Sequence, residues 1–152
     1  MNNKIGSIGL NSSYNTGGFS VSSMRTYLEE TIWPSLPEEL RAAIKPVYKQ
    51  NDQGYFLSTL RVAEEKLWIP SDRELNCEVF GEVLPSQGEP YPLYTDNESR
   101  KKTNADGSVK NYWTRSTSRT NSNNYRYIDE NGNPSEAHPM KNEFGIAFGF
   151  CI

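Results

Sequence analysis

The side chains that could do covalent or metal chemistry are few in this chain and far apart. Cys77 and Cys151 are its two cysteines, and His138 is its single histidine. A catalytic thiol needs a neighbouring cation or a helix N-terminus and some exposure. Cys77 falls in a predicted short helix and Cys151 in an apolar C-terminal stretch, so neither context favours the thiolate. We expect two buried free thiols, with a disulfide between them as the alternative, and no zinc site, since His138 has no companion at metal spacing.

Two pairs of adjacent carboxylates, Glu64–Glu65 and Asp129–Glu130, could suggest glycosidase chemistry. Adjacent carboxylates in turns usually face water, and nothing in the sequence marks either pair as desolvated. We therefore predict no catalytic residue, no cofactor and no metal site.

Composition favours a single domain over residues 1–152. With 35% hydrophobic but 12% aromatic residues, the core should depend on large rings: Trp33, Trp68, Trp113, Phe148 and Phe150. The net charge is −3 and the basic residues are scattered apart from 100–102, which argues against a nucleic-acid partner. No apolar run approaches the roughly 20 residues that cross a bilayer, and the polar start lacks the apolar middle of a secretory signal. We expect no membrane insertion.

The elements that must position any site begin with two helices. Residues 1–19 are rich in Gly, Ser and Asn and are expected to be irregular or an edge strand. A helix near 23–33 follows from apolar residues one turn apart, and Pro34 should end it. A second helix near 37–45 should end before Pro46.

Short strands are predicted for the rest of the chain. Two should lie within 47–69, around Tyr55–Leu57 and Lys66–Ile69. The others are expected at 112–116, 125–128, about 135–138 and 145–151. A turn at 129–134 should join the second and third of these.

The connecting segments carry two further predictions. Ser71 and Glu74 form a capping box that should open a short helix ending at Gly81. Residues 82–111 should then form a long surface excursion with one or two turns.

The block at 112–116 places an aromatic and a basic side chain close together. Trp113 is expected to be a buried anchor, with ligand stacking as the alternative. Arg115 would then need a carboxylate partner, Glu74 or Glu78.

The order of these blocks resembles that of bacterial and phage domains of unknown function with a C-type lectin-like fold. Residues 68–75 are similar to the Leu-Pro-Thr-x-x-Glu-Trp block of the related formylglycine-generating enzymes, and Gly149–Cys151 to their closing Gly-Phe-Arg. The resemblance covers roughly Ser20 to Ile152. It implies an α+β fold in which two N-terminal helices pack on small twisted antiparallel sheets with long loops.

The resemblance also sets expectations for chemistry. Formylglycine-generating enzymes use a cysteine pair with a metal, and neither cysteine here has that context. Sugar-binding C-type lectins hold calcium with tripeptides whose oxygen ligands are missing from the nearest blocks, residues 89–91 and 112–114. Variable proteins of diversity-generating retroelements share the fold and place diversified residues near the C-terminus. The Asn-rich stretch 121–142 suits such a segment, and it equally suits ordinary turns.

Rigid rings, adaptable amides and arginines are typical of a recognition surface. The residues predicted to contact a ligand are Arg119, Asn121, Asn123, Asn124, Tyr125, Arg126, Tyr127 and His138. Along a strand, Tyr125 and Tyr127 share one face while Asn124 and Arg126 share the other, so one set should bind and the other pack.

These observations predict a non-enzymatic module that binds a protein or glycan receptor and is displayed on a phage virion, for example in a tail fibre, or on a bacterial surface. The alternative is a structural virion or cell-surface domain that assembles through a larger fibre. A formylglycine-generating type of enzyme is the third possibility.

Overall fold

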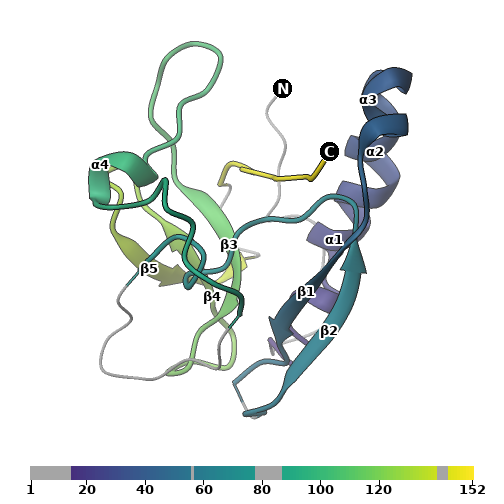
Figure 1. Cartoon of the computed structure of the whole chain (residues 1–152). Coiled ribbons are helices and arrows are strands. Elements are labelled where there is room, and N and C mark those ends of the chain that lie inside the picture. Colours follow the sequence, from purple (N-terminus) through teal and green to yellow (C-terminus); the bar gives the residue numbers. More distant parts are fainter. Residues whose placement is uncertain (1–14, 56, 78–86, 140–143) are drawn as a thin grey trace.

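The computed structural model describes residues 15–55, 57–77, 87–139 and 144–152. It is a small α+β domain with few helices and two small antiparallel sheets (Figure 1). The expectation for residues 1–14 and the predicted helix end at Gly81 lie outside the described residues. None of the helices in the described ranges has the length and apolar character needed to cross a membrane.

The first predicted helix is present but changes its winding along the way. A 3-10 turn, Phe19–Val21, leads into α1, Ser23–Tyr27, whose N-cap Ser22 accepts a hydrogen bond from the backbone of Arg25 at 3.2 Å. A π-helical turn, Leu28–Ile32, and α2, Trp33–Ser35, complete it.

The predicted helix end before Pro34 is wrong by two residues, because α2 runs to Ser35. Pro34 is the second residue of α2, just after the winding changes from π to α. Leu36, which precedes Pro37, is extended and marks the end. The second predicted helix is α3, Glu38–Ala43.

The strands within 47–69 form an antiparallel hairpin. Strand β1, Val47–Asp52, pairs with β2, Leu60–Glu65, with Val47 opposite Glu65. The number of strands was predicted correctly, but their positions were not. Tyr55 lies in the connecting turn, and Lys66–Ile69 follow the hairpin without joining a named strand. Leu67–Asp72 are all buried. The apolar run that resembles a strand in the sequence therefore passes through the core outside any named strand.

The second sheet confirms three of the four strands predicted after residue 111. It has the order β3-β4-β5, all antiparallel. The strands are β3, Tyr112–Thr117, β4, Tyr125–Ile128, and β5, Pro134–Ala137. The predicted turn between β4 and β5 is present and contains Gly132 with φ 81°, where a side chain would collide with the carbonyl of Asn97.

Both faces of this sheet are covered. Trp113 and Tyr125 belong to a core cluster with Phe19 and Leu28 from the helical side. Tyr112 and Ile128 pack in a second cluster with Leu75 and Tyr94. Trp113 is therefore the buried anchor that the sequence predicted.

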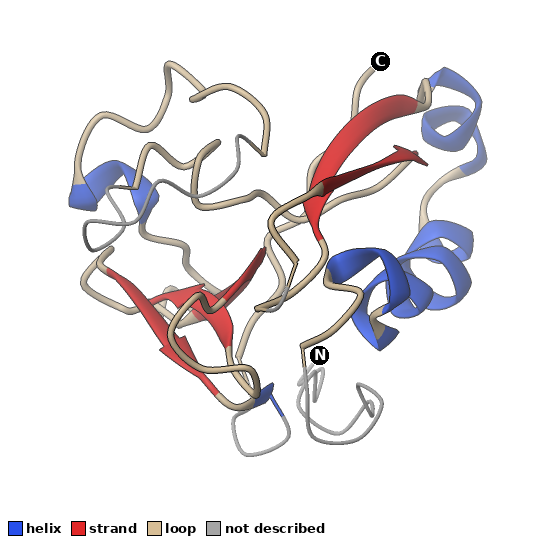
Figure 2. Ribbon diagram, turned by 90° about the horizontal axis from the view of Figure 1, so that it is seen from below, coloured by secondary structure: helices blue, strands red, loops and turns tan. Residues whose placement is uncertain are grey.

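The segment 145–151 is not the continuous strand that was expected. It makes three isolated bridges: Gly145 with Tyr112, Gly149 with Trp68, and Cys151 with Lys45. These partners belong to different parts of the fold, because the segment passes from the three-stranded sheet to the start of the hairpin (Figures 1 and 2). No single neighbouring strand runs beside it long enough to form a ladder.

Its side chains also correct two core predictions. Phe148 packs against the core as expected, but Phe150 is 38% exposed and Cys151 is exposed. Beyond Gly149 the side chains no longer alternate between a buried and an exposed face as they would in a regular strand, so both of these lie near solvent.

The described part of the predicted excursion, residues 87–111, is partly interior. It contains a short helix, α4, Asn97–Arg100, and a small hairpin closed by the bridge between Thr103 and Val109. Gln87, Tyr94 and Arg100 are buried. The expectation of a purely surface loop is wrong, because Arg100 donates to the carbonyl of Leu75 at 2.8 Å and so ties the segment to the core.

Candidate functional site

A buried cluster of charged side chains lies where the two sheets meet. The fully buried guanidinium of Arg115 donates to the carboxylate of Glu74, to the carbonyl of Ile69 at 3.1 Å and to that of Gln87 at 2.8 Å. The predicted partner of Arg115 is thus confirmed as Glu74. Lys49 donates to the other oxygen of that carboxylate at 2.9 Å.

Two cations therefore share one carboxylate. Burial would raise the pKa of Glu74, but hydrogen bonds and charge attraction from Arg115, and then from Lys49, outweigh it and lower that pKa. Glu74 stays ionised, and the triad carries one net positive charge.

The predicted capping box holds Glu74 in place. Ser71 donates its backbone N–H to Glu74 Oε2 at 3.1 Å, and Glu74 donates its own to Ser71 Oγ at 3.0 Å. Within the described residues the box opens a turn at 72–76 rather than a helix. Asn76, with φ 53°, takes the left-handed conformation that ends helical winding, so the predicted helix is corrected to one turn.

The other buried carboxylates are also held by the protein itself. Asp72 accepts from Arg126 Nε at 2.8 Å and from Thr114 Oγ1 at 2.7 Å. Burial raises the pKa of Asp72, with Arg126 opposing the shift. Asp52 accepts from the backbone and the hydroxyl of Thr117 at 2.9 and 2.8 Å. These carboxylates organise the interior and offer no open acid–base pair to a substrate.

The two thiols differ in their surroundings. Burial raises the pKa of Cys77 to about 12. Cys77 is half-buried and Cys151 exposed, so the expectation of two buried thiols fails, while both are free and the alternative disulfide is not formed. Across the described residues no group of three or more metal-ligating side chains is arranged to hold an ion.

An open groove of about 710 Å³ lies beside the buried charged cluster, with Lys49 common to both. We call it the aromatic groove. The hairpin contributes Lys49 and the following Trp68; the segment around α4 contributes Tyr91, Tyr94 and Lys102; residues 146–151 form the remaining wall. Gly149 exchanges two backbone hydrogen bonds with Trp68, at 2.7 and 3.2 Å, which fixes this wall beside the indole.

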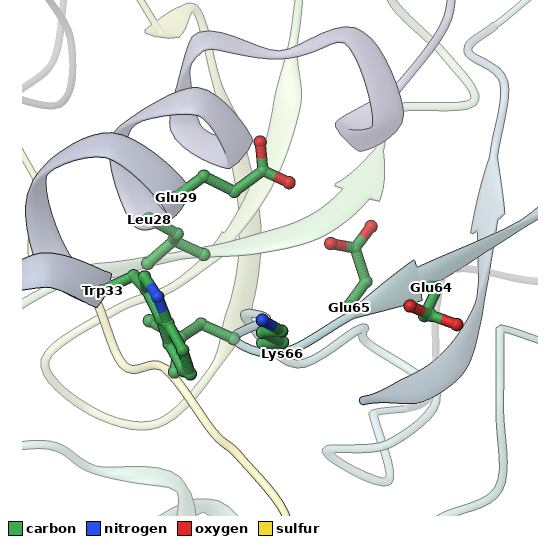
Figure 3. A pocket seen from close by; sticks show the side chains of 7 residues that line it. Leu28, Glu29, Trp33, Glu64, Glu65 and Lys66 are labelled. Carbon is green, nitrogen blue, oxygen red and sulfur yellow. The ribbon is translucent and has the colours of Figure 1, made fainter. Parts of the chain in front are cut away.

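A smaller cavity of about 290 Å³ lies between the N-terminal helix and the end of β2. We call it the acidic cavity. Glu29, Trp33 and Leu28 enter it from the helix, and Glu64, Glu65, Lys66 and Leu67 from the other side (Figure 3). Arg25 binds both oxygens of Glu65 at 2.9 and 3.1 Å and Glu29 at 2.9 Å. The ammonium of Lys66 lies 4.7 Å from the centre of the Trp33 ring.

Three of the residues predicted to contact a ligand pack in the interior instead. Tyr125 and Arg126 are buried, Tyr125 in the helix-side cluster and Arg126 against Asp72. Tyr127 is half-buried, with its ring centre 4.4 Å from that of Phe144. The expectation that one face of β4 would remain for binding is corrected, because the sheet is covered on both sides.

The other five residues lie around the β3–β4 turn. Arg119 donates to the carbonyls of Gly54 and Leu57 at 3.2 and 3.1 Å and so binds the turn to the β1–β2 hairpin. Asn121 is exposed, while Asn123, Asn124 and His138 are half-buried. His138 follows Ala137, which pairs with Tyr125, so it lies beside the same turn.

The aromatic groove was missed at the level of sequence. Its rings and lysines come from segments far apart in the chain, and no spacing rule connects them. The local signal was the pair Tyr91 and Tyr94 in a proline-rich stretch, of which only Tyr91 entered an expectation, as part of the calcium tripeptide 89–91.

The fold and these sites define a small α+β domain with an ion-paired core and an open groove. The model of a family described as a domain of unknown function (DUF6273) matches residues 3–152, and the chain belongs to this family. No curated protein and no solved structure shows a significant match to the chain.

Proposed function

We propose that this chain is a non-enzymatic binding module and that the aromatic groove is its ligand site. The observation that carries the proposal is a separation of roles. The buried carboxylates are held by internal partners, whereas the groove presents rings and lysines to an open space. Sites of this kind, with apolar walls and a few placed polar groups, are the usual form of ligand pockets.

A C-type lectin-like fold is part of this proposal. Its support is the α+β class, the helices beside small antiparallel sheets and the long connections, together with the motif order in the sequence. The same resemblance places the module on a phage virion or bacterial surface, where it would meet a protein or glycan receptor.

The turn at 118–124 remains a second candidate contact surface. It is rich in Asn and partly exposed, and it would be the segment varied if this were a variable protein of a diversity-generating retroelement. A reverse-transcriptase gene next to a near-copy of the 3′ coding segment would support that reading, and their absence would remove it.

The test is a screen of glycans and cell-surface extracts with matched variants. Tyr91→Ala removes a groove ring, and Tyr48→Ala removes an exposed ring outside the groove. Tyr91→Ala should weaken binding on the order of tenfold or more if the ring is a central anchor, and Tyr48→Ala should not. Equal binding by both variants and the wild type would place the site elsewhere.

A structural role in assembly is the second candidate, and one observation favours it. Tyr48 is 74% exposed and Val62 59% exposed, both on the outer face of the β1–β2 hairpin. Neighbouring exposed apolar side chains often mark a protein interface. In this case sedimentation would show an oligomer that Tyr48→Ser dissociates and Tyr91→Ala leaves intact.

A further inference from the structure

We infer that the aromatic groove selects acidic saccharides, meaning sugars that carry a carboxylate or a sulfate. The inference rests on the proposed function of the groove and adds the class of ligand. It comes from the charge, the spacing and the type of the side chains that line it.

The first step is charge. The described residues that line the groove include two lysines and no aspartate or glutamate, although the chain as a whole carries a net charge of −3. Lys102 makes no ion pair with any described carboxylate, whereas its neighbour Lys101 is bound to Glu98 at 2.6 Å. Lys49 pairs with Glu74, and Arg115 pairs with the same carboxylate from behind. These three side chains together carry one net positive charge. The groove therefore presents a positive potential to an anion.

The second step is geometry. The ammonium of Lys49 lies 4.1 Å from the centre of the Trp68 ring and 5.4 Å from that of Tyr91. The rings of Tyr91 and Tyr94 are 6.4 Å apart, and the ammonium of Lys102 is 4.9 Å from the Tyr94 ring. The two cations thus flank a pair of tyrosine rings. A sugar ring could lay its C–H face on such a wall while its acidic group reaches a lysine.

Lys49 is already held in position for this contact. It donates to Glu74 at 2.9 Å and to the hydroxyl of Tyr91 at 2.8 Å. An ammonium has three N–H donors, so these two bonds leave one for a ligand. Because the side chain is fixed before binding, little conformational entropy is lost when the anion arrives.

The kind of cation fits a single-point contact with an acidic group rather than a two-point clamp on a phosphate. Arginine is the residue that binds phosphate through two parallel hydrogen bonds, and no arginine is among the described lining residues. Lysines act as point charges and suit a single carboxylate or sulfate. The volume of about 710 Å³ is that of a small-molecule site.

The experiment measures binding of three oligosaccharides of similar length by calorimetry: an oligogalacturonate with carboxylates, a heparin-derived fragment with sulfates, and neutral maltotriose. The acidic probes should bind roughly tenfold or more tightly than maltotriose, since a hydrogen bond to a charged group contributes about that factor. Their relative affinities would show which anion the groove prefers. Their affinity should also fall as salt is added.

Lys102→Gln and Lys66→Gln provide the matched comparison, because each removes a lysine that lies over a ring, at 4.9 and 4.7 Å respectively. Lys102→Gln should reduce the preference for acidic probes, because it removes one of the two groove cations, and Lys66→Gln should retain it in full; melting curves would confirm that both fold. Equal binding of acidic and neutral probes, equal behaviour of the two variants, or no binding of either acidic probe would overturn the inference. A receptor whose binding is abolished by Tyr91→Ala but is indifferent to charge would overturn it while leaving the proposed function in place.

Discussion

The aromatic groove and the acidic cavity are both lined by aromatic rings and charged side chains. In the described part of the chain, lysines are the charged residues of the groove, whereas carboxylates outnumber lysine in the cavity. In the acidic cavity, Arg25 bridges Glu29 and Glu65, and Lys66 covers Trp33. The protein's own cations thus pair with two of its three carboxylates and with its ring. In the groove, Lys49 and Lys102 lie over rings without a lining carboxylate among the described residues. A ring next to a lysine is therefore not enough to identify a site, and the uncompensated charge is what distinguishes the groove.

The two regions also differ in how their ion pairs are solvated. The side chains of Glu74 and Arg115 are 2% and 0% exposed, whereas Arg25 and Glu29 are 28% and 53% exposed. Water screens the second set, while the first acts in a medium of low effective dielectric. The groove's charge is set by a buried triad, whereas in the cavity Glu65 is buried but Arg25 and Glu29 are partly exposed.

The largest expected effect concerns this difference. Glu74→Gln should lower the free energy of unfolding by roughly 3 kcal/mol, the usual cost of removing one partner from a buried pair. Glu65→Gln should cost less than Glu74→Gln: Glu65 is itself buried, but its partner Arg25 is 28% exposed and regains water when the carboxylate is removed, and burial raises the pKa of Glu65 and disfavours its charged form. Urea denaturation at neutral pH measures both. Similar losses in the two variants would refute the contrast.

The pH dependence of stability in the same two variants should sharpen the contrast between the groove and the cavity. The pKa of Glu74 is lowered from an ordinary value of 4.5, so its stabilisation is complete above that value and is lost as the pH falls through the lowered one. The difference between wild type and Glu74→Gln should therefore shrink in acid. The pKa of Glu65 is raised, so the free energy of unfolding of the wild type should instead rise relative to that of Glu65→Gln as the pH falls. Parallel trends for the two variants in denaturation curves from pH 7 to pH 3 would contradict the assignment.

A smaller effect is expected from the turn that positions the triad. Ser71→Ala should cost about 1 kcal/mol, the typical loss of an N-cap, since the hydroxyl accepts from Glu74 and also donates to the carbonyl of Gln87 at 2.8 Å. Ser99 takes part in the exposed capping box of α4. Ser99→Ala is the control and should cost roughly 0.5 kcal/mol or less, the low end for caps. Thermal melting that ranks the two variants in the reverse order would count against a special role for the buried box.

The smallest effect should come from metal removal. Although Glu29, Glu64 and Glu65 line one cavity, Arg25 already pairs with two of them, so calcium would have to displace it and gains little there. The melting temperature should be unchanged by EDTA. A clear drop that calcium reverses would mean that the acidic cavity, or another oxygen-rich site, is a metal site and that the comparison above is wrong.

Local signals in the sequence predicted local features well. The capping pair Ser71 and Glu74 and the strand–turn–strand ending at Ala137 both depend on neighbours a few residues apart. The pairing of Arg115 with a carboxylate also followed, because a buried charge in a strand requires a partner.

Features that depend on tertiary placement could not be predicted in the same way. Tyr125 and Arg126 have the composition of a binding surface, but packing on both faces of β4 places them inside. The groove joins Lys49 to Tyr91 and Lys102 across long sequence separations. Nothing in the pattern of a single chain connects these residues.

The C-terminal wall of the groove has a consequence for folding. Its bridges reach Lys45, Trp68 and Tyr112, so this short segment closes loops that include much of the chain. Contacts between residues distant in sequence form slowly, because the loop entropy is lost before the contact is gained. The segment is also synthesised after all of its partners. We expect the groove to be the last part of the domain to mature, so a newly made chain would pass through an interval in which its core has formed but its binding site has not.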